Sequence, residues 1–178
     1  MILLVLHGAP ATGKYTIARE LAALTGAQLY HNHEVVDPIL EQHLFGSPEF
    51  VAERDRAWRA GLRERLGAGG PGVIFTFNPE NSVPQEFVDW LFGELPKETR
   101  ATLHSVELVA TEAAIEARLG SDQRKGFRKL TDVALYRYLR EAGAFATPVM
   151  PRTDLRLNTE TCTPSEAARE IASKFNLA

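Results

Sequence analysis

Two apolar patterns alternate along the chain. Continuous apolar runs at residues 2–6 and 73–77 predict strands that are covered on both faces of a sheet. The segments 28–31 and 106–110, and the apolar pair Leu155 and Leu157, predict three further strands. Between the strands, apolar residues recur every three or four positions, which is typical of helices with one buried face. The pattern therefore predicts strands that alternate with helices.

Capping signals mark the start of most predicted helices. The last helix has the clearest signal, because Thr163, Pro164 and Glu166 combine the spacing of a capping box with proline at the first helical position. A helix over residues 14–25 is expected to end at Gly26. We expect the other helices to begin at Asp37-Pro38, Ser47-Pro48, Ser82 with Gln85, Thr111, and Thr131, the last of these ending at Gly143.

Alternating strands and helices are joined by crossover connections, which make neighbouring strands parallel. The predicted fold class is therefore α/β, with helices on both faces of a parallel sheet. No repeat, low-complexity segment or linker divides the sequence, so we expect a single domain over residues 1–178.

Composition narrows the classes of partner. The formal net charge of −3 argues against broad binding of nucleic acid or of membrane surfaces. The apolar run at 2–6 is too short to span a membrane and lacks a basic leader, so it predicts a buried strand and not a signal peptide. The single cysteine, Cys162, cannot form an internal disulfide. We expect a cytoplasmic protein without nucleic-acid or membrane partners, and the oligomeric state stays open.

The segment GAPATGKYT at residues 8–16 carries the most specific chemistry. It lies between a predicted strand and a predicted helix, where backbone N–H groups can wrap around a phosphate and the helix N-terminus adds a partial positive charge. The lysine supplies a charge for the outer phosphates. The predicted phosphate-binding residues are Gly8, Ala9, Pro10, Ala11, Thr12, Gly13, Lys14, Tyr15 and Thr16.

Tyr15 departs from the usual pattern of this loop. A serine or threonine normally stands there and reaches Mg²⁺, which a tyrosine hydroxyl cannot do in the same geometry. Thr16 is turned by about 100° around the helix axis and is expected to contact an inner phosphate. We expect Mg²⁺ to be held by nucleotide oxygens, water and more distant residues, and its protein ligands stay open.

The loop, the alternation of strands and helices, and the late basic segment RLGSDQRKGFRKL at 118–130 resemble the small P-loop phosphotransferases. That group is typified by shikimate kinase, gluconate kinase, chloramphenicol phosphotransferase and the nucleoside monophosphate kinases. The resemblance spans nearly the whole chain in outline, with the loop as its one specific motif. It implies a three-layer P-loop NTPase fold with a five-stranded parallel sheet in the order 2-3-1-4-5. It also implies a substrate-binding helical region at 32–70 and a lid at 119–131.

The end of the second predicted strand departs from the shikimate kinases, which carry Asp-x-Asp there. This chain has His31 and His33, followed by Glu34 and Asp37. A neutral imidazole is a competent base near pH 7, and Asp37 can orient an acceptor hydroxyl, although an aspartate before proline is also a common helix cap. A lone His-x-His is a weak metal signal. We expect His31, His33 and Asp37 to serve the acceptor, and shikimate is not the expected acceptor.

Two further groups of residues are candidates for the site. The segment TFNPEN offers Thr76, Asn78, Glu80 and Asn81, either to hold the acceptor or to form a turn. The basic segment is either a solvated face or a lid that closes over phosphates. The resemblance implies that Arg118 lies near the nucleotide base and that Arg124 reaches the phosphates.

We therefore predict an ATP-dependent phosphotransferase, with Mg²⁺, that acts on a hydroxyl of a small molecule. Two alternatives stay open. A nucleotide hydrolase needs a positioned water and no acceptor pocket, and a non-catalytic nucleotide-binding module needs neither.

Overall fold

The computed structural model describes residues 1–120 and 130–177. Parallel strands form one five-stranded sheet in the order β2-β3-β1-β4-β5, which confirms the predicted fold class and strand order. The strands are β1 (Ile2–His7), β2 (Gln28–His31), β3 (Gly72–Phe77), β4 (Thr102–Val109) and β5 (Leu155–Asn158).

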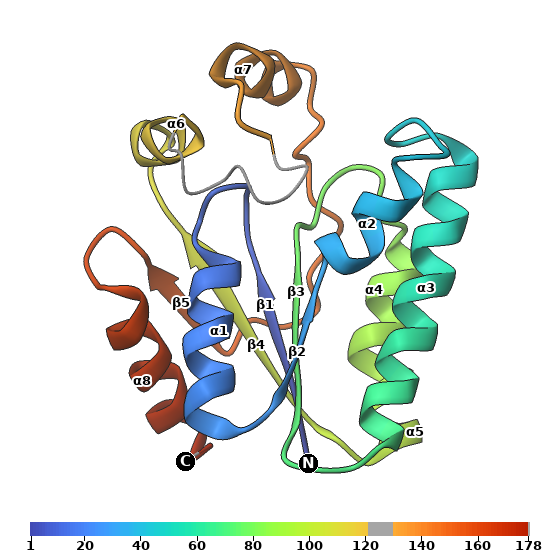
Figure 1. The fold of residues 1–178 in the computed structure, drawn as a ribbon, viewed down its shortest axis with the longest axis vertical. Coiled ribbons are helices and arrows are strands. Elements are labelled where there is room, and N and C mark those ends of the chain that lie inside the picture. Colours follow the sequence, from blue (N-terminus) through green and yellow to red (C-terminus); the bar gives the residue numbers. More distant parts are fainter. Residues whose placement is uncertain (121–129, 178) are drawn as a thin grey trace.

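Helices cover both faces of the sheet (Figure 1). The helices α1 (Lys14–Thr25) and α8 (Pro164–Phe175) lie on one face, and α3 (Pro48–Gly67) with α4 (Gln85–Asp89) lies on the other. The helices α6 (Glu112–Leu119) and α7 (Val133–Glu141) stand above the carboxyl ends of the strands. The remaining helical elements are α2 (His33–Ile39), the π-helical turn η1 (Trp90–Glu94) and α5 (Leu95–Thr99).

The continuous apolar runs are explained by two cores, one on each face of the sheet. Successive residues of a strand point to opposite faces, so Leu3 and Val5 of β1 pack with Trp58 of α3, while Leu4 and Leu6 pack against α1 and α8. A strand that is buried on both faces needs apolar residues at every position.

The structure corrects the predicted start of the helix at Asp37. Asp37 and Pro38 lie inside α2, which begins at His33. Burial of Val36 and Ile39 favours the earlier start, and the Asp37 carboxylate pairs with His33 one turn back. Pro38 has no N–H to continue the helical hydrogen bonds, and the helix ends one residue later.

Other boundaries also differ from the prediction. The N-cap of α4 is Pro84 and not Ser82, and the N-cap of α7 is Asp132 and not Thr131, because the Asp132 carboxylate accepts hydrogen bonds from two backbone N–H groups. The segment from α4 to α5, expected as one helix, contains the π-helical turn η1. Strand β4 begins four residues before the predicted 106. The caps at Ser47, Thr111 and Thr163 are confirmed.

None of the helices in the described parts of the chain combines the length and the apolar character needed to cross a lipid bilayer.

Candidate functional site

The predicted phosphate-binding loop, residues 8–13, which we call the phosphate loop, joins the end of the central strand β1 to α1. Gly8 has a φ of 144°, and a Cβ atom there would lie 2.2 Å from the carbonyl oxygen of Leu108 on β4. Gly13 caps α1 with a φ of 88° and has no side chain to occupy the helix N-terminus. The loop therefore depends on glycine at both ends, and its backbone N–H groups can approach an anion closely.

Lys14 lies over its own loop. Its Nζ donates hydrogen bonds to the carbonyl oxygens of Gly8 and Ala9, both at 2.7 Å. The Thr12 hydroxyl also donates to the carbonyl oxygen of Ala9. These bonds hold the ammonium group above the curve of the loop, where it can neutralise the charge of a bound phosphate.

His7 lies directly below the loop at the end of β1. Burial, together with the positive charge of Lys14, lowers the pKa of His7 from 6.5 to about 4. Its Nε2 lies 3.1 Å from the Ser105 hydroxyl on β4. His7 is therefore neutral near pH 7, and Lys14 is the cationic group of the pair.

Three aromatic rings connect the loop to the start of α2. The Tyr15 ring lies 4.4 Å from the ring of His31, which lies 5.2 Å from the ring of His33. The Nδ1 atom of His31 lies 2.8 Å from the Thr76 hydroxyl at the end of β3. Tyr15 therefore packs between the phosphate loop and the two histidines, and its ring contacts the ring of His31.

His33 and Asp37 form a pair on α2. The Nδ1 atom of His33 lies 2.7 Å from Oδ1 of Asp37, one helical turn further on. Because a carboxylate only accepts hydrogen bonds, His33 donates through its Nδ1–H, and this bond fixes the orientation of the imidazole ring. The structure thus brings the two predicted residues together, with His33 facing the cavity and Asp37 orienting it.

Arg54 and Glu80 form a second pair that is almost completely buried. Arg54 is 2% exposed and donates to the Glu80 carboxylate at 2.8 Å, and to the hydroxyl and the carbonyl oxygen of Ser82. The Glu80 carboxylate also accepts from the backbone N–H and the hydroxyl of Ser82. The guanidinium group packs on the rings of Phe50 and Trp58. Each buried charge is therefore neutralised by the other.

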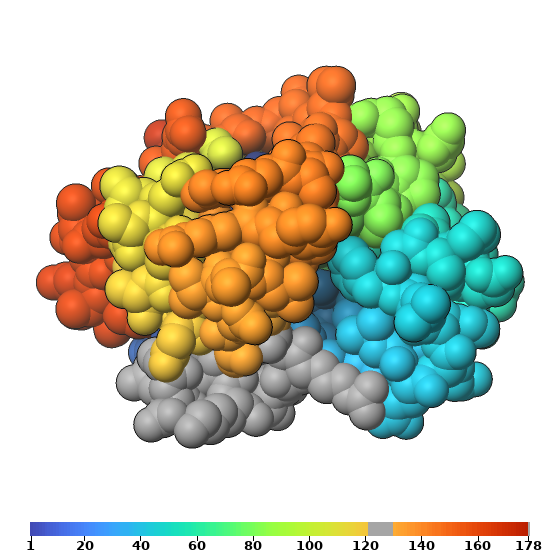
Figure 2. All heavy atoms as spheres, turned by 90° about the horizontal axis from the view of Figure 1, so that it is seen from above, coloured from blue at the N-terminus to red at the C-terminus, as the bar shows by residue number. Residues whose placement is uncertain are grey.

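Lys14, Tyr15, the two histidines and the Arg54–Glu80 pair line one cavity of about 1370 Å³ (Figure 2). Figure 2 looks down on it from above, where a hollow separates α7, in orange, from the blue and cyan segment of α2 and α3. Of the predicted phosphate-binding residues, Pro10, Ala11, Gly13, Lys14, Tyr15 and Thr16 line it, together with His31, His33, Thr76, Asn78 and Glu80. Gly8, Ala9 and Thr12 line a second cavity of about 610 Å³ on the other side of the loop.

Arg118, near the end of α6, forms a hydrogen bond with the phosphate loop. Its guanidinium donates to the Ala11 carbonyl oxygen at 3.3 Å, and to the hydroxyl and the carbonyl oxygen of Thr159, both at 2.8 Å. Arg118 also lines the cavity, so it lies beside the predicted nucleotide site. Arg124 and most of the predicted lid lie outside the described residues, and their role stays a prediction.

The described residues bear on Mg²⁺ in two ways. They contain no group of three or more His, Cys, Asp or Glu side chains placed to hold a metal ion. However, Asn78 lines the cavity, and its buried Oδ1 has no hydrogen-bond partner in the part of the chain that the structure describes. Amide oxygens suit Mg²⁺, which keeps several waters, so Asn78 fits a magnesium ion held mainly by nucleotide and water.

Two residues of the site were not identified from the sequence. Arginine is rarely buried, so Arg54 was not placed in the core, although it lies on the same helical face as Phe50 and Trp58, four residues to either side. That spacing is the signal that could have found it. Thr159, the partner of Arg118, follows β5 and has no local signal in the sequence.

The fold and the loop together define a P-loop architecture, and solved structures share it. The chain is similar to a sugar kinase from Janibacter sp. HTCC2649, with 17% identity, a TM-score of 0.68 and coverage of 100% of this chain and 96% of that one. It is similar to a gluconokinase from Sinorhizobium meliloti 1021, with 17% identity, a TM-score of 0.63 and coverage of 98% and 91%.

An APS kinase from Mycobacterium tuberculosis, solved in complex with AMPPNP and APS, has 16% identity, a TM-score of 0.63 and coverage of 98% of this chain and 97% of that one. No protein-family model and no curated protein matches the sequence. The resemblance to the P-loop small-molecule kinases is thus confirmed at the level of the fold.

Proposed function

We propose that this protein is an ATP-dependent phosphotransferase that transfers a phosphoryl group to a hydroxyl of a small molecule. One observation carries the proposal: Lys14 and part of the phosphate loop face the same cavity as His33, whose imidazole is oriented by Asp37. A site for phosphate and a base for a second substrate meet there, as phosphoryl transfer requires. The similarity in fold to a sugar kinase and a gluconokinase supports the proposal.

The loop and Lys14 would bind the donor. Backbone N–H groups of residues 8–13 and the N-terminus of α1 would contact the inner phosphates, and the Lys14 ammonium would exchange its loop carbonyl partners for phosphate oxygens. Arg118 would lie beside the nucleotide base. Thr16 would contact an inner phosphate, and Asn78 would help to hold Mg²⁺, which would supply further neutralisation of the phosphate charge.

The opposite side of the cavity, formed by α2, α3 and the end of β3, would bind the acceptor, and we call it the acceptor side. His33 would take the proton of the acceptor hydroxyl at Nε2 as the new P–O bond forms and the bond from the γ-phosphorus to the ADP oxygen breaks. Asp37 would stabilise the resulting imidazolium. His31 and Thr76 would form the polar floor beside them.

The proposal is tested with ATP, Mg²⁺ and a library of small hydroxyl compounds, by following ADP release and by detecting phosphorylated product in a mass spectrometer. We expect ADP release that depends on an acceptor. Lys14→Ala should lower it by roughly 100-fold or more, because the charge on the transferring group loses its main side-chain partner. Lys97→Ala removes an exposed lysine from α5, at the far end of the sheet, and is the matched control.

Other results would favour the alternatives. Steady ADP release without any acceptor indicates a nucleotide hydrolase. Tight ATP binding without turnover indicates a nucleotide-binding module. Turnover that survives Lys14→Ala contradicts the assigned role of the loop.

A further inference from the structure

The cavity has a polar floor and an apolar wall. The floor consists of the histidines, Thr76, Asn78 and the Arg54–Glu80 pair. The wall is formed by Leu135 and Leu139 of α7 with Phe145, which face Leu40 and Phe45 across the cavity. The volume of about 1370 Å³ exceeds the roughly 300–1,000 Å³ of a typical ligand pocket, as a site for two substrates should.

Two apolar side chains of α7, Leu135 and Leu139, line the cavity and are not buried in the hydrophobic core. Tyr136 is buried against Ile115 and Leu119 of α6, so the core contact of α7 is already made. Leu135, the preceding residue, is nevertheless 45% exposed and lines the cavity, and Phe45 opposite is 56% exposed. Large apolar side chains that are exposed together at the wall of a concave site are typical of ligand contacts.

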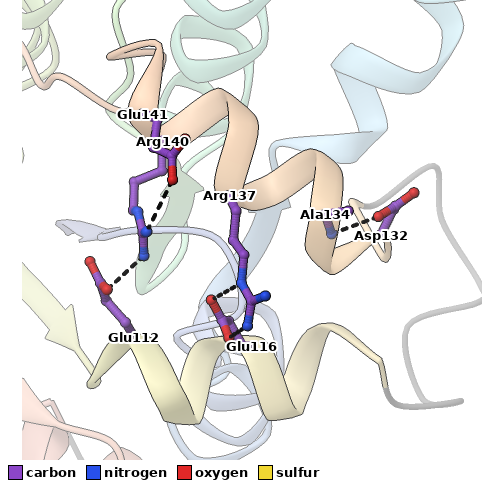
Figure 3. Close-up of polar contacts among 7 residues, drawn as sticks. All are labelled: Glu112, Glu116, Asp132, Ala134, Arg137, Arg140 and Glu141. Atoms are coloured by element: carbon purple, nitrogen blue, oxygen red, sulfur yellow. Dashed lines mark hydrogen bonds and ion pairs between the residues drawn. The ribbon is translucent and has the colours of Figure 1, made fainter.

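Ion pairs fix the direction in which α7 presents its leucines (Figure 3). Arg137 donates two hydrogen bonds to Glu116 of α6, at 2.8 and 2.6 Å, and Arg140 donates to Glu112 at 2.6 Å. Both arginines point from α7 toward α6, as Figure 3 shows. The pairs hold α7 on its α6 side. Within the described chain, the residues of α7 that line the cavity are Leu135 and Leu139, and Leu130, Thr131 and Asp132 line it just before the helix.

The charges on the acceptor side are neutralised within the protein. The charged or ionisable side chains that α2 and α3 contribute to the cavity wall are His33 and Arg54, and each is paired with a carboxylate, Asp37 or Glu80. A strongly anionic acceptor would find the Arg54 guanidinium already engaged with Glu80 and Ser82. The acceptor side is therefore suited to an uncharged molecule.

We infer that the acceptor is an uncharged hydroxyl compound with an apolar body, such as an alkyl or aromatic group. Its hydroxyl reaches His33, and its apolar body packs on Leu135 and Leu139 of α7. The role of this ligand as phosphate acceptor rests on the proposed function. Its chemical class follows from the apolar wall, the polar floor and the paired charges of the cavity.

The test is direct binding, measured by isothermal titration without ATP, of hydroxyl compounds in matched pairs. Ethanol is compared with 2-phenylethanol, glucose with phenyl β-D-glucoside, and 2-phenylethanol with the anionic 3-phenyllactate. We expect the phenyl member of each neutral pair to bind about tenfold or more tightly, because the ring is removed from water. We expect 3-phenyllactate to bind no more tightly than 2-phenylethanol.

Two variants locate the preference. Leu135→Gln and Leu139→Gln should each reduce the advantage of the phenyl compounds several-fold, since the ring then meets a polar side chain. Leu24→Gln on α1 is the matched control, because Leu24 is also 45% exposed and does not line the cavity. Equal binding within the neutral pairs, an unchanged phenyl preference in both α7 variants, or tighter binding of the anion would overturn the inference.

The binding assay separates this inference from the proposed function. A phenyl preference that depends on Leu135, in a protein that transfers no phosphate, would leave the ligand class standing and reject the phosphotransferase. Phosphoryl transfer to polar or anionic acceptors, without any phenyl preference in binding, would support the phosphotransferase and reject the inferred ligand class.

Discussion

The two sides of the cavity are built by different means. The phosphate loop is made of main chain, and its geometry depends on Gly8 and Gly13 and on a lysine that is held by loop carbonyls. The acceptor side is made of paired side chains, of which Arg54–Glu80 joins residues far apart in the sequence. A short motif is enough to specify the first, whereas the second needs partners that only the fold brings together. We expect the loop to define the chemistry and the acceptor side to define the substrate.

The largest effect is expected at the proposed base. His33→Gln should lower the rate of phosphoryl transfer by roughly 10²- to 10⁴-fold, the usual contribution of a general base, with little change in binding of an ATP analogue. His43→Gln is the control, because His43 also lies near a carboxylate, 3.5 Å from Glu53, but does not line the cavity. A rate that falls equally in both variants would count against a catalytic role for His33.

The second-largest effect is expected on the stability of the fold. Glu80→Gln leaves the Arg54 charge buried without its carboxylate and should lower the free energy of unfolding by about 3–5 kcal/mol. The control is Glu98→Gln, which breaks the exposed pair with Arg63 and should change stability little. Urea unfolding of both variants measures the difference. Similar losses in the two would mean that the buried pair is not what stabilises the acceptor side.

The smallest effect is expected in the loop backbone. Gly8→Ala forces an L-residue to a φ of 144° against the Leu108 carbonyl and should destabilise the fold by roughly 2 kcal/mol or more. It should also weaken binding of an ATP analogue. Gly93→Ala in η1 is the control, because a Cβ there meets nothing within 4 Å. Unfolding curves and nucleotide titrations that do not separate the two variants would contradict the requirement for glycine at position 8.

Most of the fold could be predicted from the sequence because its signals are local. The apolar runs of β1 and β3, the glycine loop and the capping box at Thr163 each depend on a few neighbouring residues. The order of the strands came from the resemblance and not from the pattern. Asp37-Pro38 was misplaced because the cap signal competed with burial of Val36 and Ile39, which local spacing does not weigh.

The sequence pointed to residues on both sides of the cavity, but on the acceptor side it did not predict how they pair. The segment GAPATGKYT is a local motif, and the structure places residues 8–13 between β1 and α1 and residues 14–16 in the first turn of α1. His33 and Asp37 were predicted as separate candidates and not as a pair, because the helix was expected to begin at Asp37 and the two residues share a helical turn only when it begins at His33. The buried position of Arg54 was not predicted, because its carboxylate partner is 26 residues away in the sequence and no local pattern connects the two.

The attachment of α7 has a consequence for how long a bound molecule stays. Tyr136 is the α7 residue, within the described chain, that is buried in the core, and the ion pairs to α6 are reached by solvent on at least one side. Such pairs weaken as salt screens them, and elements with few buried contacts open at a small cost in free energy. We therefore expect α7, with Leu135 and Leu139, to move away from the cavity at a smaller cost in free energy than unfolding of the sheet. The same helix that would grip an apolar substrate would then also set the rate at which the product escapes.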